Sequence, residues 1–481
     1  MVDEPWFPAA RKLRHALEYV RFLDPAFDGS PKLRLRATGR APRLVRWLGR
    51  VPGLRRTPLR RAAAAVLMQI ERLLPPSAKD LAFLRAAAPD VVLLTSLTSP
   101  RAPQLDHQKA ARSLNIPVGA CIMSWDHLSS KAPIHLVPDR VLVWNEVQRR
   151  EAIAMHALPP DRLVVTGAQC YDQWFDRQPS VDRETFCRAL GLDPARPVVL
   201  YVGSTMSPAP TPSEPEVVSA WLDALRASPD GRLRGANVLV RPHPERAKDW
   251  RTFDVSERGP AAVRGASPLD GDVKAAYFDA LFHSSAVVGV CTTAFLEAAI
   301  VGRPVLALLL PAFRIHQDAM VHFRYLVEVE GGILQTAETF DQHLRQLSAS
   351  LDRPAGPGSE AFLRAFIRPG GIDVPATPRF AAAVESLARE RPAPASAAPA
   401  WYRPLLVPIA RHLSDRPARG LTRWLLMDAV ETERERLEQG RRRAKERARR
   451  VRARNPRKQL ARLKTQIKRA LGLRLEASDD D

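Results

Sequence analysis

Short apolar runs that alternate with polar, helix-like segments constrain this chain more than any other feature. In its first half the runs are Asp90–Leu97, Ile116–Trp125, Arg140–Asn145 and Arg162–Gly167. Helix-like segments such as 102–114 and 146–158 separate them. Strands that alternate with helices at this spacing indicate βαβ units and a parallel sheet.

The same pattern restarts after a helix-like link at Arg183–Leu190. The sequence predicts strands at Pro197–Ser204, Asn237–Pro244, Ala286–Val290 and Pro304–Pro311, with helices between them. We therefore expect an α/β protein with two Rossmann-like parallel-sheet domains that face a cleft. In such sheets, ligands bind just beyond the carboxyl ends of the strands.

The 481 residues divide into four predicted parts. Residues 1–85 form a basic helical segment, and residues 86–185 form an amino-terminal Rossmann-like domain. Residues 186–390 form a second, carboxyl-terminal Rossmann-like domain, and residues 391–481 form a Pro/Ala linker followed by a basic helical tail. This division follows the usual size of domains and the shifts in composition along the chain.

Positive charge is concentrated near both ends of the chain. The net charge is +21, from 73 Lys and Arg against 52 Asp and Glu. A basic face attracts polyanions such as nucleic acid, anionic lipid or phosphate-bearing substrates. In the tail, an Arg/Lys run near Trp401, Leu405, Trp424 and Leu425 suits an anionic membrane surface, and a solvated helix is the alternative.

Several classes of protein are not indicated. The four cysteines (Cys121, Cys170, Cys187 and Cys291) lack the spacing of a zinc site or a disulfide framework. The amino terminus has no apolar signal-peptide region, and the apolar stretch Ala286–Phe313 is interrupted by Glu297 and Arg303. We expect a cytoplasmic protein, peripheral on the inner face of the membrane if the tail binds lipid.

The segment Asn237–Arg246 ends a strand with one histidine between two prolines. A proline holds the preceding residue extended and cannot donate a ladder hydrogen bond, so Arg241 and His243 are presented rigidly at a strand end. An imidazole beside a guanidinium suits a phosphate group. A strand-end turn whose histidine caps a helix is an equally good interpretation.

A second candidate site follows the strand at Ala286. Thr292 and Thr293 lie where a helix begins, and free amides with hydroxyls beside them form a cradle for a diphosphate. Glu297 lies one turn further on in an apolar helix, where a sugar or ribose diol would give it a polar partner. The alternative for Glu297 is a solvated or ion-paired side chain at the edge of the helix.

Three further loops hold weaker candidates. Gly203, Ser204 and Thr205 end a strand, where glycine lets a backbone approach a ligand, although an ordinary loop is the favoured alternative. Asp126 or His127 is positioned to act as a general base on an acceptor hydroxyl, while helix capping is the favoured alternative. Glu146 and Gln148 follow another strand and are expected to point into the cleft, and Trp144 is expected to pack in the core.

These segments resemble a known group of enzymes. The pairing of His243 and Pro244 with Thr292 and Thr293, within "RPHP" and Asp270–Leu306, resembles the carboxyl-terminal half of GT-B-fold glycosyltransferases. The CMP- and CDP-dependent members are the most similar: bacterial sialyl- and Kdo-transferases and CDP-glycerol glycerophosphotransferases. UDP-N-acetylglucosamine 2-epimerase shares the fold. Ser124–Lys131 and Val143–Phe175 resemble the first half of surface-polysaccharide proteins of this superfamily.

The resemblance covers roughly residues 86–383 and implies a set of roles. The domain at residues 86–185, if complete, would bind the acceptor, and the domain at residues 186–390 would bind the nucleotide donor. His243 would contact the donor phosphates, Thr292 and Thr293 would lie near the phosphate or nucleotide, and Glu297 would bind the ribose. It implies no metal and no cofactor, a CMP-, CDP- or UDP-activated donor, and a glycan or lipid-linked acceptor. The chain departs from the group in residues 1–80, which lack the usual first strand and glycine loop, and at Cys291.

Two functions from different classes follow. The first is transfer of a sugar or glycerophosphate from a nucleotide-activated donor to a cell-envelope polysaccharide or lipid-linked acceptor. The second is a degenerate GT-B fold that binds anionic membrane or nucleic acid without catalysis. A nucleotide-sugar 2-epimerase is a further alternative, although the acids and histidines that it requires do not align here.

Overall fold

The structure is a computed structural model. It describes residues 8–51, 53, 57–99, 104–205, 212–265, 271–317, 320–352, 358–390, 392, 404, 407–408 and 428. The residues expected to anchor the tail (Trp401, Leu405, Trp424 and Leu425) lie outside these ranges, so that interpretation stays a prediction. Among the described helices, none combines the length and apolar character that a bilayer crossing requires.

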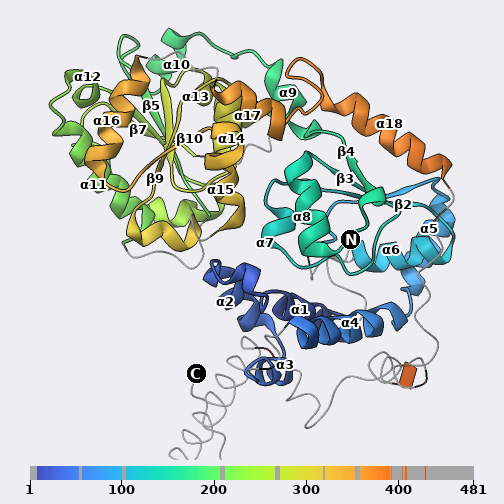
Figure 1. The fold of residues 1–481 in the computed structure, drawn as a ribbon. Coiled ribbons are helices and arrows are strands. Elements are labelled where there is room, and N and C mark those ends of the chain that lie inside the picture. The colour runs from blue at the N-terminus through green and yellow to red at the C-terminus, as the bar shows by residue number, and fades with distance from the viewer. Residues whose placement is uncertain are drawn as a thin grey trace, which may run out of the picture.

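Two parallel sheets confirm the predicted fold class, and each forms the centre of one lobe in Figure 1. The first sheet has the order β1-β2-β3-β4. Its strands are β1 (Val92–Leu94), β2 (Val118–Cys121), β3 (Arg140–Val143) and β4 (Leu163–Val165), and all neighbours pair in parallel. Every strand falls within one of the predicted apolar runs.

The second sheet has the order β10-β9-β8-β5-β6-β7, with all pairs parallel. Its strands are β5 (Val198–Val202), β6 (Asn237–Arg241), β7 (Ala261–Val263), β8 (Ala286–Gly289), β9 (Val305–Leu308) and β10 (Leu334–Ala337). The chain starts at the central β5, runs outward to β7, and returns to β8 on the other side of β5. This is the doubly wound Rossmann order, in which ligands bind where the strand order reverses, here between β5 and β8.

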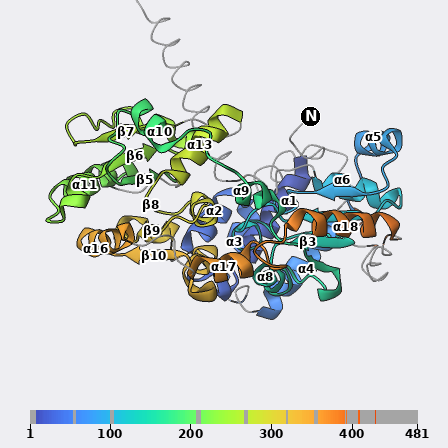
Figure 2. The same cartoon turned by 90° about the horizontal axis from the view of Figure 1, so that it is seen from above.

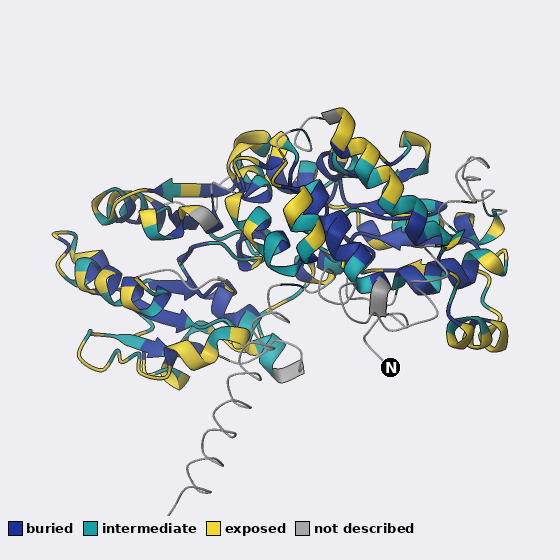
Figure 3. Ribbon diagram, turned by 90° about the horizontal axis from the view of Figure 1, so that it is seen from below, coloured by how far each residue is buried: buried dark blue, intermediate teal, exposed yellow. Residues whose placement is uncertain are grey.

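Burial on both faces explains why the central strands read as continuous apolar runs. All five residues of β5 are buried. Val198, Leu200 and Val202 belong to a core that extends into the first lobe, whereas Val199 and Tyr201 pack on the opposite face with Trp221. Figure 3 shows the strands of both lobes mainly in the colour of buried residues.

The helices that precede, connect and follow the strands lie around both sheets (Figure 2). They are α5 (Ala78–Ala87), α6 (Gln104–Ser113), α7 (His127–Ser130), α8 (Glu146–His156), α9 (Asp172–Phe175), α10 (Arg183–Ala189), α11 (Glu214–Arg226), α12 (Gly231–Arg234), α13 (Gly271–Phe282), α14 (Ala294–Ile300), α15 (Val321–Glu328) and α16 (Phe340–Leu351). Short 3-10 turns lie at Pro25–Phe27, Pro160–Arg162, Gln169–Tyr171, Pro244–Trp250, Pro311–His316 and Val329–Gly331.

The last described helices return to the first lobe. After α17 (Gly358–Phe366), α18 (Ala376–Arg389) crosses over and packs against β2 and β3 (Figure 1). A Cβ on Gly119 of β2 would lie 2.9 Å from Leu387, so glycine permits this close packing. The predicted donor segment 186–390 therefore includes one helix that covers the first sheet.

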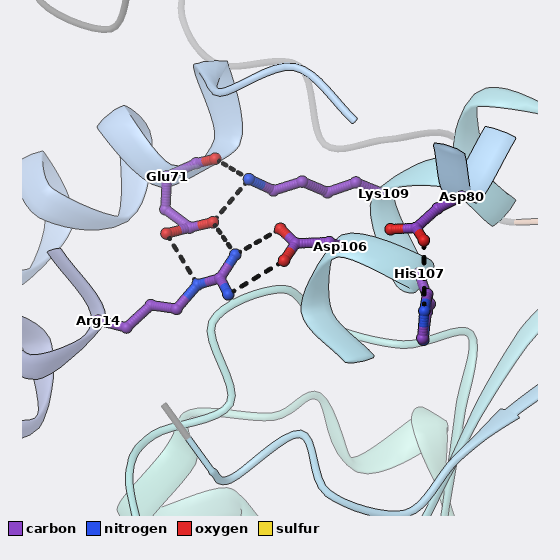
Figure 4. Close-up of polar contacts among 6 residues, drawn as sticks. All are labelled: Arg14, Glu71, Asp80, Asp106, His107 and Lys109. Atoms are coloured by element: carbon purple, nitrogen blue, oxygen red, sulfur yellow. Dashed lines mark hydrogen bonds and ion pairs between the residues drawn. The ribbon is translucent and has the colours of Figure 1, made fainter. Parts of the chain in front are cut away.

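The basic amino-terminal segment forms the helices α1 (Pro8–Arg21), α2 (Pro31–Arg40), α3 (Arg43–Leu48) and α4 (Thr57–Leu73), which lie below the two lobes in Figure 1. A buried ionic network fastens them to the first lobe (Figure 4). Arg14 of α1 contacts Glu71 of α4 at 3.0 Å and Asp106 of α6 at 2.6 Å, and Lys109 contacts Glu71 at 2.6 Å. The network thus joins α1 and α4 to α6 of the first lobe.

Candidate functional site

A cavity of about 640 Å³ lies between the two lobes and the helix α2. The second lobe contributes Thr205, His243, Cys291, Thr292, Thr293, His316, Met320 and His322. The first lobe contributes Trp125, Asp126, Ser130 and Lys131, and α2 contributes Lys32, Leu33, Leu35, Arg36 and Arg40. Thr205 follows β5, and Cys291 to Thr293 follow β8, so the cavity lies at the reversal of strand order, where such sheets bind ligands.

The two prolines present His243 at this cavity as the sequence predicts. His243 is extended, with φ −66° and ψ 134°, and its Nδ1 accepts a hydrogen bond from the amide of Glu245 at 3.2 Å. It thereby caps the 3-10 turn Pro244–Trp250, which is the alternative interpretation of this histidine. Burial lowers the pKa of His243, against an opposing effect of Glu245. The imidazole is therefore neutral at neutral pH, and the hydrogen bond to Nδ1 assigns its proton to Nε2. In this state Nε2–H is available to donate a hydrogen bond.

Gly203 allows the histidine to sit where it does. Its amide donates to the carbonyl of Arg241 at 2.9 Å. A Cβ at this position would lie 2.8 Å from the amide nitrogen of His243 and 3.2 Å from Cα of Pro242. Since both atoms belong to the backbone, no side-chain rotation would relieve the contact. The sequence analysis expected Gly203 to let the backbone approach a ligand. In the structure the close approach is to the His243 segment, and Gly203 does not line the cavity.

Arg241 has a different neighbour from His243. Its guanidinium lies 5.2 Å from the centre of the Tyr277 ring, and burial lowers its pKa. The Tyr277 hydroxyl in turn bonds the carboxyl of Glu297. Neither Arg241 nor Glu297 lines the cavity. The polar partner that the sequence required for Glu297 is therefore Tyr277, and burial raises the pKa of this carboxyl to about 7.

Ser204 and the two threonines already take part in contacts between strands and lobes. The hydroxyl of Ser204, a buried residue, accepts from the amide of Cys291 at 3.3 Å, which joins the loops after β5 and β8. The hydroxyl of Thr292 accepts from the amide of Ala294 at 3.4 Å. The indole of Trp125 donates to Thr293 at 3.3 Å across the two lobes. Thr292 and Thr293 still line the cavity, whereas Ser204 supports it from behind.

Asp126 lines the cavity, but its contacts make it a weak base. It accepts hydrogen bonds from Ser124 at 2.6 Å and Ser130 at 2.8 Å. Burial opposes ionisation of Asp126, yet Lys131, His322 and the Ser124 hydroxyl outweigh it and hold the pKa below the usual range. His127 is half-buried outside the cavity lining, and burial lowers its pKa.

The expectation that Glu146 and Gln148 point into the cleft is not met. Glu146 is exposed and pairs with Arg149 at 3.5 Å; it lines a separate depression with Glu330 and Glu360. Gln148 is buried and bonds the amide of Trp144 at 2.8 Å. Trp144 packs in the core, edge to face with Tyr171 at 5.6 Å.

The sequence analysis did not predict that the basic helix α2 lines the cavity. Lys32, Arg36 and Arg40 recur every four residues, so they share one face of the helix, and this face lines the cavity. Lys32 contacts Nδ1 of His316 at 2.7 Å, which links α2 to the second lobe. Arg36 bonds the carbonyl of Ser130 and contacts Glu18 at 3.2 Å.

Charge in the cavity is mainly positive. Lys and Arg line it at positions 32, 36, 40 and 131, against one carboxylate, Asp126. Glu18 balances part of this charge, since it lies 3.2 Å from Arg36 and 3.8 Å from Arg40. Among the residues that the structure describes, no three His, Cys, Asp or Glu side chains gather where they could hold a metal ion. The net positive charge of the cavity therefore suits an anionic ligand.

His322 is the second residue that the sequence did not indicate. It is 7% exposed, lies edge to face with Trp125 at 4.8 Å, and lines the cavity. Burial lowers its pKa to about 4, so it is neutral at neutral pH. Within the described part of the chain its Nδ1 has no hydrogen-bond partner. Since Nδ1 is enclosed by protein, a ligand in the cavity would meet the other atoms of the ring.

Behind the cavity, Glu214 gives the fold a pH-dependent contact. It accepts from the Tyr201 hydroxyl at 2.9 Å and from the amide of Ser204 at 3.1 Å. Burial raises its pKa to about 7, so the folded protein holds a proton that the unfolded chain loses near pH 4.5. Stability from this group is greatest below pH 4.5 and is lost as pH rises through about 7.

Glu214→Gln is expected to remove this dependence. As the pH rises from 5 to 8, the wild type should lose unfolding free energy relative to the variant. The loss should be at most about 3 kcal/mol, the value that corresponds to the shift in pKa. Urea unfolding of both proteins across this range measures the difference. A difference that stays constant with pH would show that Glu214 ionises normally in the folded protein. Glu216→Gln is a control, because burial of Glu216 is negligible and its pKa is lowered by Ser213.

Comparisons with known proteins give similarities of fold at low identity. No family model matches the sequence, and no curated protein matches it. A UDP-GlcNAc 2-epimerase from Methanocaldococcus jannaschii is 11% identical, with a TM-score of 0.45, over 66% of this chain and 82% of that chain. A glycosyltransferase from Rickettsia africae ESF-5 is 11% identical, with a TM-score of 0.42, over 64% and 80%.

A third similar structure is a putative UDP-N-acetylglucosamine 2-epimerase from Listeria monocytogenes. It is 16% identical, with a TM-score of 0.43, over 67% of this chain and 81% of that chain. The similar structures therefore come from the two groups that the sequence resembles, glycosyltransferases and UDP-GlcNAc 2-epimerases. The roles of individual residues in this chain depend on its own geometry.

Proposed function

We propose that the protein transfers a sugar or glycerophosphate group from a nucleotide-activated donor to a hydroxyl of a glycan or lipid-linked acceptor. The observation that carries this proposal is the cavity between the lobes. It combines the strand-order reversal of a Rossmann sheet, the Nε2–H donor of His243 and the hydroxyls of Thr205, Thr292 and Thr293 with an excess of cations. Donors, hydroxyls and positive charge together suit the phosphates of an activated donor.

In the proposed reaction, an oxygen of the acceptor attacks the activated carbon of the sugar, or the phosphorus of a glycerophosphate donor. The bond to the leaving phosphate oxygen breaks as the new bond forms. His243 donates its Nε2–H to the phosphate oxygen on which negative charge develops, and Lys131 adds charge from the opposite lobe. Such stabilisation favours the transition state because the donors are in place before the charge develops.

On the acceptor side, His322 takes the position that the sequence analysis gave to Asp126 or His127. Its neutral imidazole accepts the hydrogen bond of the acceptor hydroxyl and takes its proton as the new bond forms. The carboxylate of Asp126 meanwhile holds Lys131 at 3.6 Å and two serine hydroxyls. In this assignment Asp126 is a positioning residue. Neither this assignment nor the donor side requires a metal ion or a cofactor in the proposal.

Nucleotide binding tests the proposal directly. The melting temperature of the full-length protein is measured with CMP, CDP, UDP and GDP at millimolar concentration. We expect one nucleotide to raise it by about 2 °C or more, since a ligand that binds only the folded state stabilises it. Glu146 is a predicted binding residue that lies outside the cavity. The Glu146→Gln variant should therefore show the same shift in melting temperature as the wild type.

Product analysis separates the alternatives. Release of nucleotide from the matching donor in proportion to an added acceptor supports a transferase. Conversion of the sugar without acceptor-dependent release of nucleotide indicates an epimerase. No thermal shift with any nucleotide or nucleotide sugar would contradict the proposal and favour a fold that binds without catalysis.

A further inference from the structure

The apolar stripe of α3 faces away from the protein. Leu44, Trp47 and Leu48 of α3 and Val51, three residues beyond its end, follow the spacing i, i+3, i+4, i+7 of one helix face. Such a face normally packs on the core, yet these side chains are 37%, 62%, 41% and 48% exposed. In the described part of the molecule, no residue of α3 is buried.

Packing on α1 holds the helix in this orientation. Val45, on the other side of α3, packs against the large core. Gly49 lies so close to α1 that a Cβ on it would be 2.3 Å from the Tyr19 hydroxyl. The inner side of α3 is therefore fixed, and the stripe of Leu44, Trp47, Leu48 and Val51 is presented outward.

The charge around the stripe is of one sign. From Gly29 to Ile70 the sequence has eleven Lys and Arg and neither Asp nor Glu. Arg43, Arg46 and Arg50 alternate with the stripe residues along α3 and just beyond it. Apolar side chains with a tryptophan, flanked by arginines on a short helix, are typical of a segment that lies in the interface of an anionic bilayer.

We propose that the stripe of α3 inserts into the headgroup region of an anionic membrane and docks the protein there. Nucleic acid offers no apolar phase for leucine and valine, so it does not account for the stripe. The carboxyl-terminal segment 440–470 is itself rich in Arg and Lys, so its charge does not complement the arginines around α3. An anionic membrane surface would attract both α3 and the segment 440–470.

Docking through α3 would also bring the cleft to the membrane. Ala41 and Pro42 alone separate α3 from α2, whose Lys32, Leu35 and Arg36 line the cavity. Leu35 is 61% exposed, so this side of the cavity meets solvent. This inference rests on the proposed function. Docking at a membrane favours a lipid-linked acceptor over a free glycan, and an anionic group on that acceptor would pair with the cations of α2.

Vesicle binding tests the docking surface without any assay of activity. The full chain is sedimented with vesicles of equal parts phosphatidylglycerol and phosphatidylcholine, and with vesicles of phosphatidylcholine alone. We expect binding to the first only, weaker at 0.5 M salt because screening shortens the reach of the arginines. Trp47→Gln with Leu48→Gln should lower the partition coefficient at least about ten-fold, since less apolar surface is buried.

Two controls make the result specific. Phe83→Gln replaces a residue of α5 that is as exposed as Trp47, at 62%, and should bind as the wild type does. Arg50→Gln should weaken binding about five-fold, the effect of one charge at an anionic surface. Melting temperatures of all variants should stay close to the wild type, because the replaced side chains are exposed.

Three outcomes would overturn the proposal. The first is full-strength binding by the Trp47/Leu48 variant, which would place the contact elsewhere in the chain. The second is absence of binding to anionic vesicles. The third is conversion of a wild-type oligomer to monomer by the same substitutions without vesicle binding, which would make the stripe an interface between copies. Loss of vesicle binding with nucleotide binding intact separates this surface from the proposed function.

Discussion

Replacing Arg14 with methionine is expected to lower the free energy of unfolding by about 3–5 kcal/mol. Arg14 is 1% exposed and lies between two carboxylates, Glu71 at 3.0 Å and Asp106 at 2.6 Å. Removing the guanidinium would leave these two buried carboxylates with Lys109 as the one cation of the network (Figure 4). Uncompensated charge in a buried site is costly, whereas the methionine itself fits an apolar environment.

The directions of the pKa shifts of Arg14 and Glu71 agree with this argument. Burial opposes the charge of Arg14, yet Glu71 and Asp106 outweigh it and raise its pKa. Burial likewise opposes the charge of Glu71, yet Lys109 and then Arg14 outweigh it and lower its pKa. Each partner keeps the other charged, so the loss of one member removes the compensation of the rest.

A second substitution tests the mechanism. Adding Asp106→Asn to Arg14→Met leaves Glu71 paired with Lys109, and this should recover part of the loss. Arg188→Met is the control, because Arg188 pairs with Glu184 on the surface, where a single ion pair contributes less than about 1 kcal/mol. Denaturant unfolding gives the values. If Arg14→Met and Arg188→Met cost the same, the network does not stabilise the fold as argued.

The sequence predicts the two sheets because parallel strands buried on both faces read as continuous apolar runs. It did not predict β7 and β10, since "AAV" and "LQTA" at the edges of the second sheet are short and weakly apolar. Tertiary pairing with β6 and β9 decides their structure. The return of α18 to the first lobe is likewise a matter of tertiary packing.

The candidate site was predictable where a residue follows a strand directly. Asp126, Thr205, His243, Thr292 and Thr293 all meet at one cavity for that reason. The contribution of α2 was not predictable, although its basic residues recur every four positions. Lys32 reaches His316, which is 284 residues away in the chain, and no local pattern reports such a contact. Similarly, only packing distinguishes His322 from an ordinary buried histidine.

His243→Ala is expected to reduce turnover of the nucleotide-activated donor about a hundred-fold, the usual effect of removing one donor to a developing negative charge. The fall should appear mainly in kcat, since the hydrogen bond strengthens as the leaving phosphate gains charge. The fold should be retained, because the backbone of this segment is set by Pro242, Pro244 and Gly203 rather than by the imidazole.

Two amide variants locate the active nitrogen. The terminal NH₂ of Gln lies near the position of Nε2 of histidine, whereas that of Asn lies near Nδ1. Since Nδ1 of His243 is occupied by the amide of Glu245, His243→Gln should keep part of the activity and His243→Asn should not. Equal activity of the two variants would contradict a role for Nε2–H.

The pH profile gives a further test of the same role. Because burial lowers the pKa of His243, the wild-type rate should not change with the ionisation of this residue between pH 7 and pH 8. A rate that fell over this range only when His243 is present would indicate that the charged imidazole is the active form. His127→Ala is the matched control: this histidine is also half-buried with a lowered pKa, but it lies outside the cavity lining, so turnover should be retained.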